Sequence, residues 1–175
     1  MIPVTVLAVR LLANASPALC KGLGAPAGHP SLGMLTTDCD DATYIALDEA
    51  TKAADVQVCF GQSFYAGAAN ASTPLAGEVP YLAHTVSSCG SFLAKEAGVE
   101  PGSALAYLIA PPLESMYALD AAMKAADVKL CKLYAPPSET NFGGGLLSGT
   151  QSACDAACGA FAAAVAEVAD RPKEW

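Results

Sequence analysis

The chain has 175 residues, of which 53% are hydrophobic and 15% are charged, which suits a globular core and is too little charge for a disordered protein. Its net charge of −8, with only nine scattered Lys and Arg residues, argues against nucleic acid as a partner, because phosphate binding needs concentrated positive charge. Seven cysteines, an odd number without a CxxC pair, favour reduced thiols in a cytosolic compartment.

The first part of the chain is predicted to alternate strands and helices. A strand is predicted over residues 4–12, and we favour it over a signal peptide because the chain lacks a basic start and Arg10 interrupts the apolar run. A short helix ending at Gly24, a strand over residues 32–35, an alanine-rich helix and a third strand over residues 56–60 follow. The order is therefore strand, helix, strand, helix, strand.

The second part of the chain repeats this order. It begins with a predicted strand over residues 81–88 and a helix that ends at Gly98. A strand over residues 105–110, a second alanine-rich helix and a strand over residues 128–134 come next. One further helix is predicted over residues 150–169, and it is long enough to cover a sheet.

One short block of sequence occurs twice. ALDEATKAADVQVC, residues 46–59, returns as ALDAAMKAADVKLC, residues 118–131, with ten of fourteen residues identical. A repeat of this size allows each copy to be a small domain, and we place the two domains at residues 1–79 and 80–175. Alternating strands and helices predict an α/β sandwich in which helices pack on a sheet.

The repeated block resembles the signature of bacterial microcompartment shell domains. Longer stretches, such as AYLIAPPLESMYALDAAMKAADV and PPSETNFGGGLLSGTQSACDAACGAF, resemble tandem-domain shell proteins of the EutL type, which belong to ethanolamine utilisation, and such stretches cover most of the chain in order. The resemblance implies circularly permuted, ferredoxin-like shell domains. Three chains would form a pseudohexameric tile with a gated central pore for metabolites or cofactors. The tile would join other shell proteins laterally in a microcompartment in the cytoplasm.

Two lysines occupy the same position of the repeated helices. Lys52 and Lys124 each stand within a stretch that is otherwise rich in alanine. A single lysine on a helix usually belongs to a solvated face. The resemblance implies that both lysines lie at the edge of the tile and contact the neighbouring tile.

Two segments rich in Gly, Ala, Ser, Pro and Asn, residues 65–78 and 134–149, follow the third strand of each copy. In an isolated domain they would be ordinary polar surface loops, and the glycine run lacks the Lys-Ser or Lys-Thr of a phosphate loop. In a ring of six domains such loops converge on the axis. The resemblance therefore implies a pore lined by Asn70, Ser72, Thr73, Glu78, Asn141, Phe142, Gly143 and Gly144.

An acidic pair precedes the first repeated helix. Asp40 and Asp41 could cap that helix, but one aspartate suffices, and the second copy has Leu113-Glu114-Ser115 in that neighbourhood. The resemblance implies that Asp40, Asp41, Ser138 and Glu139 bind ethanolamine at subunit interfaces. Carboxylates suit the ammonium of an amino alcohol, and a hydroxyl suits its alcohol end.

The sequence gives little support to an enzyme. It has two histidines, His29 and His84, with no HExxH and no nucleophile elbow, and we expect no catalytic residue, cofactor, metal or membrane contact. Cys154 and Cys158 are one helical turn apart and could share a metal, but small core residues are the favoured interpretation. The alternative function is a soluble, metabolite-binding regulatory oligomer without a shell role.

The first copy is shorter than the second. After its third strand it runs from Val79 directly into Pro80, where the second copy begins. The resemblance implies a further strand and helix between these points, which the first copy lacks. Such a domain would leave one sheet face uncovered. We therefore predict further residues between Val79 and Pro80 in the physical polypeptide, the alternative being a natural deletion that neighbouring subunits compensate.

Overall fold

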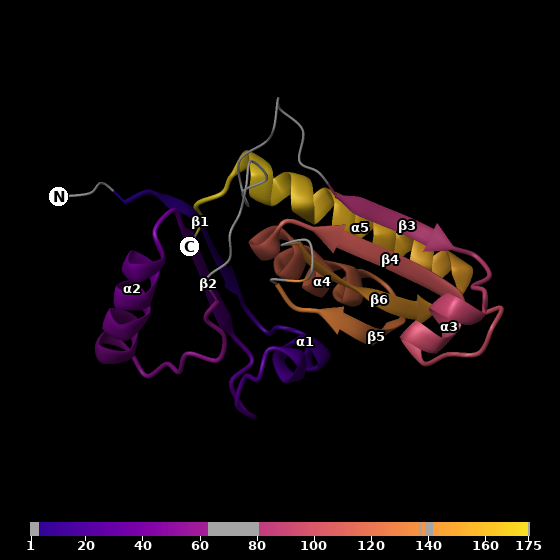
Figure 1. Ribbon diagram of the computed structural model, residues 1–175, viewed down its shortest axis with the longest axis horizontal. Helices are drawn as coiled ribbons and strands as arrows, with labels where there is room; N and C mark the ends of the chain where they lie inside the picture. The colour runs from indigo at the N-terminus through magenta and orange to yellow at the C-terminus, as the bar shows by residue number, and fades with distance from the viewer. Residues whose placement is uncertain (1–3, 63–80, 137, 139–141, 175) are drawn as a thin grey trace.

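The computed structural model describes residues 4–62, 81–136, 138 and 142–174. We refer to residues 4–62 as the first half and to the described residues from 81 onward as the second half. Figure 1 shows the first half, with α2 at one end of the molecule, beside a second half that is built on a larger sheet. The mixed helix-and-sheet fold predicted from the sequence is confirmed.

The sheet of the second half has four antiparallel strands in the order β3-β4-β6-β5. They are β3 (Leu82–Val86), β4 (Ala104–Ala110), β5 (Val128–Tyr134) and β6 (Gly143–Gly149). Three of these strands match predicted strands. The fourth does not, because the sequence prediction places residues 143–149 in a loop, and this prediction is wrong.

The glycines of β6 allow that strand to lie close to both of its neighbours. Gly144 has a φ of +149°, and a Cβ atom at this position would lie 1.9 Å from the carbonyl oxygen of Leu108 on β4. At Gly145 a Cβ would lie 2.6 Å from the carbonyl oxygen of Lys132 on β5. Side chains would clash at both positions, so the glycine run forms a central strand instead of a loop.

Three helices cover the two faces of this sheet: α3 (Ser91–Ala97), α4 (Pro112–Ala125) and α5 (Gln151–Asp170). Helices α4 and α5 pack against each other and against one face, while α3 covers β5 and β6 from the other (Figure 1). The first turn of α5 is held by Thr150, whose hydroxyl accepts the Ala153 N–H at 3.1 Å. The predicted final helix is confirmed.

Helix α5 is long and apolar enough to cross a membrane by length and composition alone. Its apolar residues Phe161, Val165 and Val168 are fully buried within the protein. The apolar character of α5 therefore serves the core of the second half.

The first half contains β1 (Val6–Leu12), α1 (Pro17–Gly22), β2 (Leu32–Thr37) and α2 (Asp40–Ala53). Strands β1 and β2 form an antiparallel pair. The predicted strand over residues 56–60 is absent from the structure, and that prediction is wrong. The equivalent strand of the second half, β5, pairs with β6. The described part of the first half has no counterpart of β6, so residues 56–60 have no strand to pair with.

The two halves share one hydrophobic core. Leu19 of α1 is fully buried in the same cluster as Phe161 of α5. Gly22 of α1 faces β5 so closely that a Cβ there would lie 2.3 Å from Cδ2 of Leu133. The first half therefore completes its burial against the second half in addition to its own β1-β2 sheet.

Candidate functional site

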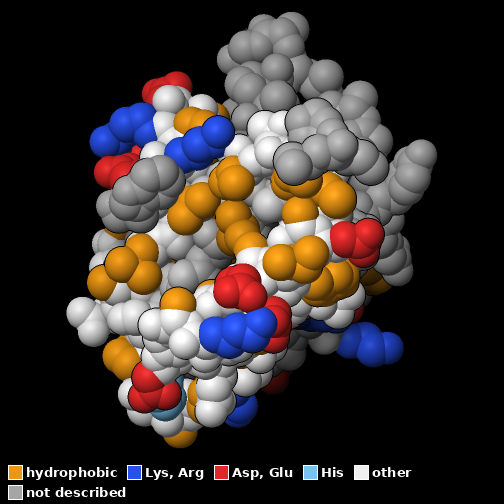
Figure 2. Space-filling model, turned by 90° about the vertical axis from the view of Figure 1, so that its left-hand side faces the viewer, with side chains coloured by type: hydrophobic (Ala, Val, Ile, Leu, Met, Phe, Trp, Pro, Cys, Tyr) orange, Lys and Arg blue, Asp and Glu red, His pale blue; other side chains and the backbone are white. Residues whose placement is uncertain are grey.

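A groove of about 850 Å³ opens where the two halves meet. Its walls include Met34 of β2, Thr43 and Leu47 of α2, Leu113 of α4, and Pro136 from the segment after β5. Figure 2 views the molecule from the side on which α2 lies and shows hydrophobic side chains gathered there. The groove is mostly apolar, so it can bind a small molecule or a segment of protein that buries apolar surface.

The groove reaches the neighbourhood of both predicted ligand-binding segments. Thr43 lies two residues after Asp41, and Pro136 lies two residues before Ser138, and both line the groove. Asp41 and Ser138 themselves are not part of the lining. The structure thus brings the two segments to one cavity within a single chain.

The four predicted ligand residues are described to different extents. Asp41 is exposed in the first turn of α2, and the backbone N–H of Ser138 donates to the carbonyl of Phe142 at 3.3 Å. Asp40 begins α2, but its side chain lies outside the description, as does the whole of Glu139. Ethanolamine binding by these residues stays a prediction.

The start of α2 does not use the acidic pair as its N-cap. The N-cap residue is Cys39, and its side chain makes no capping bond. Instead, the hydroxyl of Thr37 accepts the Cys39 N–H at 3.2 Å and lies 2.6 Å from the Thr43 hydroxyl. Helix capping at that position therefore does not account for Asp41.

The corresponding turn of the second half is built differently. Glu114 and Ser115 are fully buried at the start of α4, and the Ser115 hydroxyl donates to the Pro112 carbonyl at 2.7 Å. Asp41, by contrast, is exposed. The asymmetry between the copies that the sequence predicts is therefore present in the structure.

The two repeated lysines have different surroundings. Lys52 is 59% exposed and contacts Asp48 at 2.5 Å and Glu49 at 2.9 Å, and these carboxylates raise the pKa of Lys52. Lys124 is 46% exposed and contacts Asp120 at 2.6 Å. It also donates to the carbonyl of Ala13 at 3.1 Å, so it lies where the two halves meet.

Most of the predicted pore residues lie outside the described part of the chain, namely Asn70, Ser72, Thr73, Glu78 and Asn141. Phe142 is half-buried just before β6. Gly143 and Gly144 are not loop residues, because they pair with Ala110 and Ile109 of β4. The prediction that these two glycines belong to a loop is wrong, because both lie in the central strand β6, where a Cβ at Gly144 would clash with the carbonyl of Leu108 on β4.

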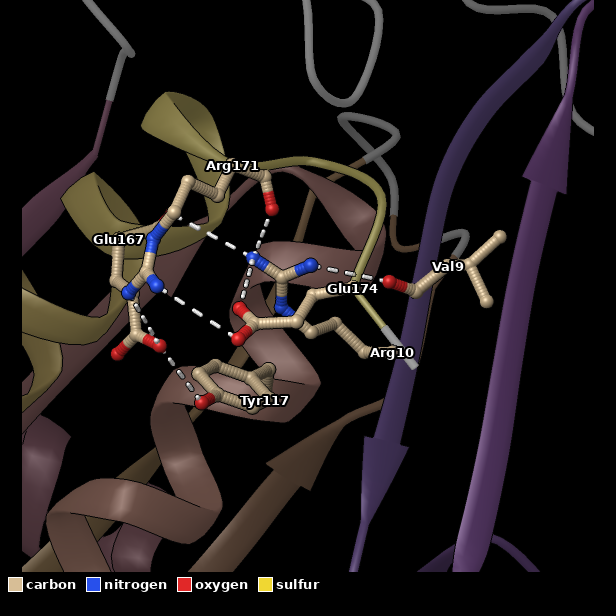
Figure 3. A network of polar contacts seen from close by, with 6 residues as sticks. All are labelled: Val9, Arg10, Tyr117, Glu167, Arg171 and Glu174. Carbon is tan, nitrogen blue, oxygen red and sulfur yellow. Dashed lines mark hydrogen bonds and ion pairs between the residues drawn. The ribbon is translucent and has the colours of Figure 1, made fainter.

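A polar network that the sequence analysis did not identify joins the halves (Figure 3). Arg10 of β1 is 3% exposed, and its guanidinium donates to the backbone carbonyls of Val9 at 3.0 Å, Glu167 at 3.4 Å and Arg171. It also lies 3.8 Å from the carboxylate of Glu174. An arginine inside an apolar run was the signal that could have revealed this network, because a buried charge needs polar partners.

The end of the chain continues this connection. The Val9 N–H donates to the Pro172 carbonyl at 2.9 Å, and the Glu174 N–H donates to the Val9 carbonyl at 3.2 Å. Val9 also forms an isolated parallel bridge with Lys173. Residues 172–174 therefore extend the edge of the small β1-β2 sheet and fix the two halves to each other.

The seven cysteines differ in burial. All seven are free, and Cys154 and Cys158 on α5 are buried. Burial raises the pKa of both thiols. In the described part of the chain, no cluster of three or more His, Cys, Asp or Glu residues is arranged to hold a metal ion.

Comparison with known proteins places the chain among shell proteins. No family model matches it. The bacterial microcompartment shell protein EutL of Clostridium perfringens is 51% identical over an alignment that covers 95% of this chain and 94% of the relative. The EutL of Salmonella typhimurium is 41% identical, with 96% and 94% covered.

Comparison with solved structures leads to the same family. Crystal structures of EutL from Clostridium perfringens and Leptotrichia buccalis are 49% and 50% identical, each with a TM-score of 0.55. The matches cover 97% and 99% of this chain, and 94% and 98% of the two solved chains. The match to the fused permuted hexameric shell protein MSM0275 covers 94% of this chain and 98% of the MSM0275 chain. Its sequence identity is 22% and its TM-score is 0.66, which shows the same fold.

The alignment with the Clostridium perfringens relative also reveals a difference in length. It runs over 205 residues, whereas 95% of this 175-residue chain is about 166 residues, so about 39 residues of the relative have no counterpart here. The absence of a β6 counterpart from the described first half is consistent with this difference.

Proposed function

The chain belongs to the EutL family of bacterial microcompartment shell proteins, and we propose that three copies form one tile of such a shell. Its role is structural rather than enzymatic, within a microcompartment of the cytoplasm devoted to ethanolamine utilisation. The observation that carries this conclusion is the 51% identity to a shell protein over nearly the full length of both chains.

The joined halves support the proposal that each chain supplies two of six positions in a ring. We assign the two positions to residues 1–79 and 80–175. The shared core, the Arg10 network and the C-terminal residues hold the halves in one orientation. A fixed angle between successive domains is what a closed ring requires.

Passage through the tile is proposed to occur at the ring axis, through a gated pore for metabolites or cofactors. Phe142 and the segments before it and after residue 62 would surround that axis. Ethanolamine would bind near Asp40, Asp41, Ser138 and Glu139. Support comes from the groove, which is lined by Thr43 and Pro136 beside both segments.

Contacts between tiles are proposed to use Lys52 and Lys124. An ammonium has three donors. Lys124 uses one on Asp120 and one on Ala13 and is still 46% exposed, so one donor is available to a neighbouring tile. Lys52 is more exposed and contacts only acidic neighbours on its own helix among the interactions described.

Sedimentation and electron microscopy of the purified chain test this function. We expect a species of three times the mass of the single chain at micromolar concentration, and extended sheets at higher concentration. A monomer or dimer would contradict the shell function. Trimers that never form sheets would favour the alternative, a soluble oligomer that regulates by binding a metabolite.

A further inference from the structure

Helix α4 of the second half, which carries the repeated block, binds a backbone loop of the first half. The carboxylate of Asp120 on α4 accepts the backbone N–H of Ser16 at 2.6 Å and contacts Lys124 at 2.6 Å. Lys124 in turn donates to the carbonyl of Ala13 at 3.1 Å. An Asp–Lys pair on one helix thus holds the loop that connects β1 to α1.

The carboxylate in this contact is buried. The Asp120 side chain is 2% exposed. Both of its oxygens are occupied, one by the Ser16 N–H and the other by Lys124. A buried carboxylate with this arrangement of donors is a specific contact, because a different group would leave the Asp120 charge unpaired.

The first half carries the same helix with the same pair. Helices α2 and α4 both have 14 residues and end at equivalent alanines, Ala53 and Ala125. Asp48 and Lys52 occupy the places of Asp120 and Lys124 and lie 2.5 Å apart. Their side chains, however, are 63% and 59% exposed.

The second half carries the same loop. Ser16 and Gly90 are the N-cap residues of α1 and α3. In each half the residue before the N-cap is buried and donates its N–H across the loop: Ala15 to Pro30 at 2.6 Å, and Cys89 to Ser103 at 2.9 Å. The loop over residues 87–90 is exposed apart from Cys89.

The two exposed elements cannot meet within one chain. Figure 1 places α2 and α3 at opposite ends of the molecule. A second copy of the chain can bring them together. Because the joined surfaces differ, the contact is heterologous, and contacts of this kind build rings when the rotation closes.

We propose that Asp48 of one subunit accepts the backbone N–H of Gly90 of the partner subunit, repeating between chains the Asp120–Ser16 contact seen within each chain. Lys52 then donates to the carbonyl of Ser87 of the partner subunit, as Lys124 does to Ala13. The inference rests on the proposed ring of three chains and specifies which surfaces join them.

An exposed aromatic side chain next to this loop supports the same partner. Phe92 of α3 lies two residues after Gly90 and is 79% exposed, the highest value among the large hydrophobic residues of the described chain. Val56 and Val58, just beyond the C-terminus of α2, are 48% and 49% exposed. The proposed contact would place apolar side chains of both surfaces near each other and remove them from water.

Sedimentation velocity on the full chain tests the inference with three variants. Asp48→Ala and Phe92→Ser remove groups that are exposed in the single chain, so each subunit keeps its fold, which circular dichroism checks. Glu49→Ala is the matched control: Glu49 also contacts Lys52, but its counterpart in the second half is Ala121, so the observed contact has no carboxylate there.

We expect Asp48→Ala and Phe92→Ser to weaken trimer formation by about tenfold or more, as loss of a charged hydrogen bond or of apolar burial does, and Glu49→Ala to leave it unchanged. If the wild type forms trimers, either of two results would overturn the inference and leave the tile function intact. One is unchanged association of Asp48→Ala, and the other is equal weakening by Glu49→Ala. A wild-type monomer would instead contradict the tile function.

Discussion

The guanidinium carbon of Arg10 lies 5.5 Å from the centre of the Tyr117 ring, although the two residues belong to different halves of the chain. The Tyr117 hydroxyl donates to Glu167 at 3.3 Å, and burial together with Glu167 raises the pKa of Tyr117. A cation over an aromatic ring is stabilised further when water is excluded. Arg10 therefore connects β1 to both α4 and the end of α5.

Replacing Arg10 tests how much this connection contributes to stability. We expect Arg10→Ala to lower the free energy of unfolding by about 2 kcal/mol or more, because it removes charged hydrogen bonds to backbone carbonyls. Urea unfolding of the purified chain measures the change. Arg171→Ala is the control: its side chain is 63% exposed, so its ion pairs should contribute less than about 1 kcal/mol. Equal effects of the two substitutions would contradict the role of Arg10.

The repeated lysines give a prediction on tiling. We expect the double variant Lys52→Gln, Lys124→Gln to form trimers but not extended sheets. It removes the ammonium groups that face neighbouring tiles, while the shorter glutamine amide can still donate to the carbonyls of Ala13 and of Ser87 of the partner subunit. Electron microscopy detects the sheets and sedimentation detects the trimers, both on the same sample. Sheets that match those of the wild type would assign both lysines to a solvated face.

The predicted amine site is tested by calorimetry. We expect weak binding of ethanolamine to the assembled protein and its loss in the double variant Asp41→Asn, Glu139→Gln, because neutral amides cannot pair with the ammonium. A matched control is Asp55→Asn, which changes an acidic residue that lines the groove and is not one of the four predicted ligand residues. Binding that survives the first variant, or disappears in the second, would place the site elsewhere.

Tyr134 gives a prediction on pH. Burial, followed by Tyr107 and Glu96, raises the pKa of Tyr134 to about 12 from the ordinary value of 10.0. The folded chain thus holds this proton after the unfolded chain has lost it. The resulting stabilisation is complete below pH 10 and is lost as pH rises toward 12. Tyr134→Phe should remove this loss of stability, and the ultraviolet absorbance of phenolate should lose a component that titrates near pH 12.

The shortness of the first copy is tested by intact mass spectrometry. We expect a mass several kilodaltons above the 17.6 kDa of the sequence, because about 39 residues of a close relative have no counterpart and residues 56–60 find no partner strand. A mass equal to 17.6 kDa would show a natural deletion. In that case neighbouring subunits would have to cover α2 and β2.

Local patterns were sufficient wherever a segment forms its structure from its own residues. The repeat predicted two equivalent helices, and the structure contains both, α2 and α4, with equal lengths and the same Asp–Lys spacing. The final helix could be predicted because small apolar residues recur along its length, and the structure adds that Thr150 caps it. The family resemblance carried by these stretches is confirmed by the relatives.

Tertiary structure decided the remaining features, because each depends on what lies next to a segment. The residues 143–149 form a strand only because β4 and β5 lie on either side at distances that glycine tolerates, while the β-branched run at residues 56–60 fails to form one for lack of a partner. Likewise, Lys52 and Lys124 occupy the same position of the repeated block, yet only Lys124 meets the loop after β1. Such contacts join residues far apart in the sequence, so no local pattern of residues specifies them.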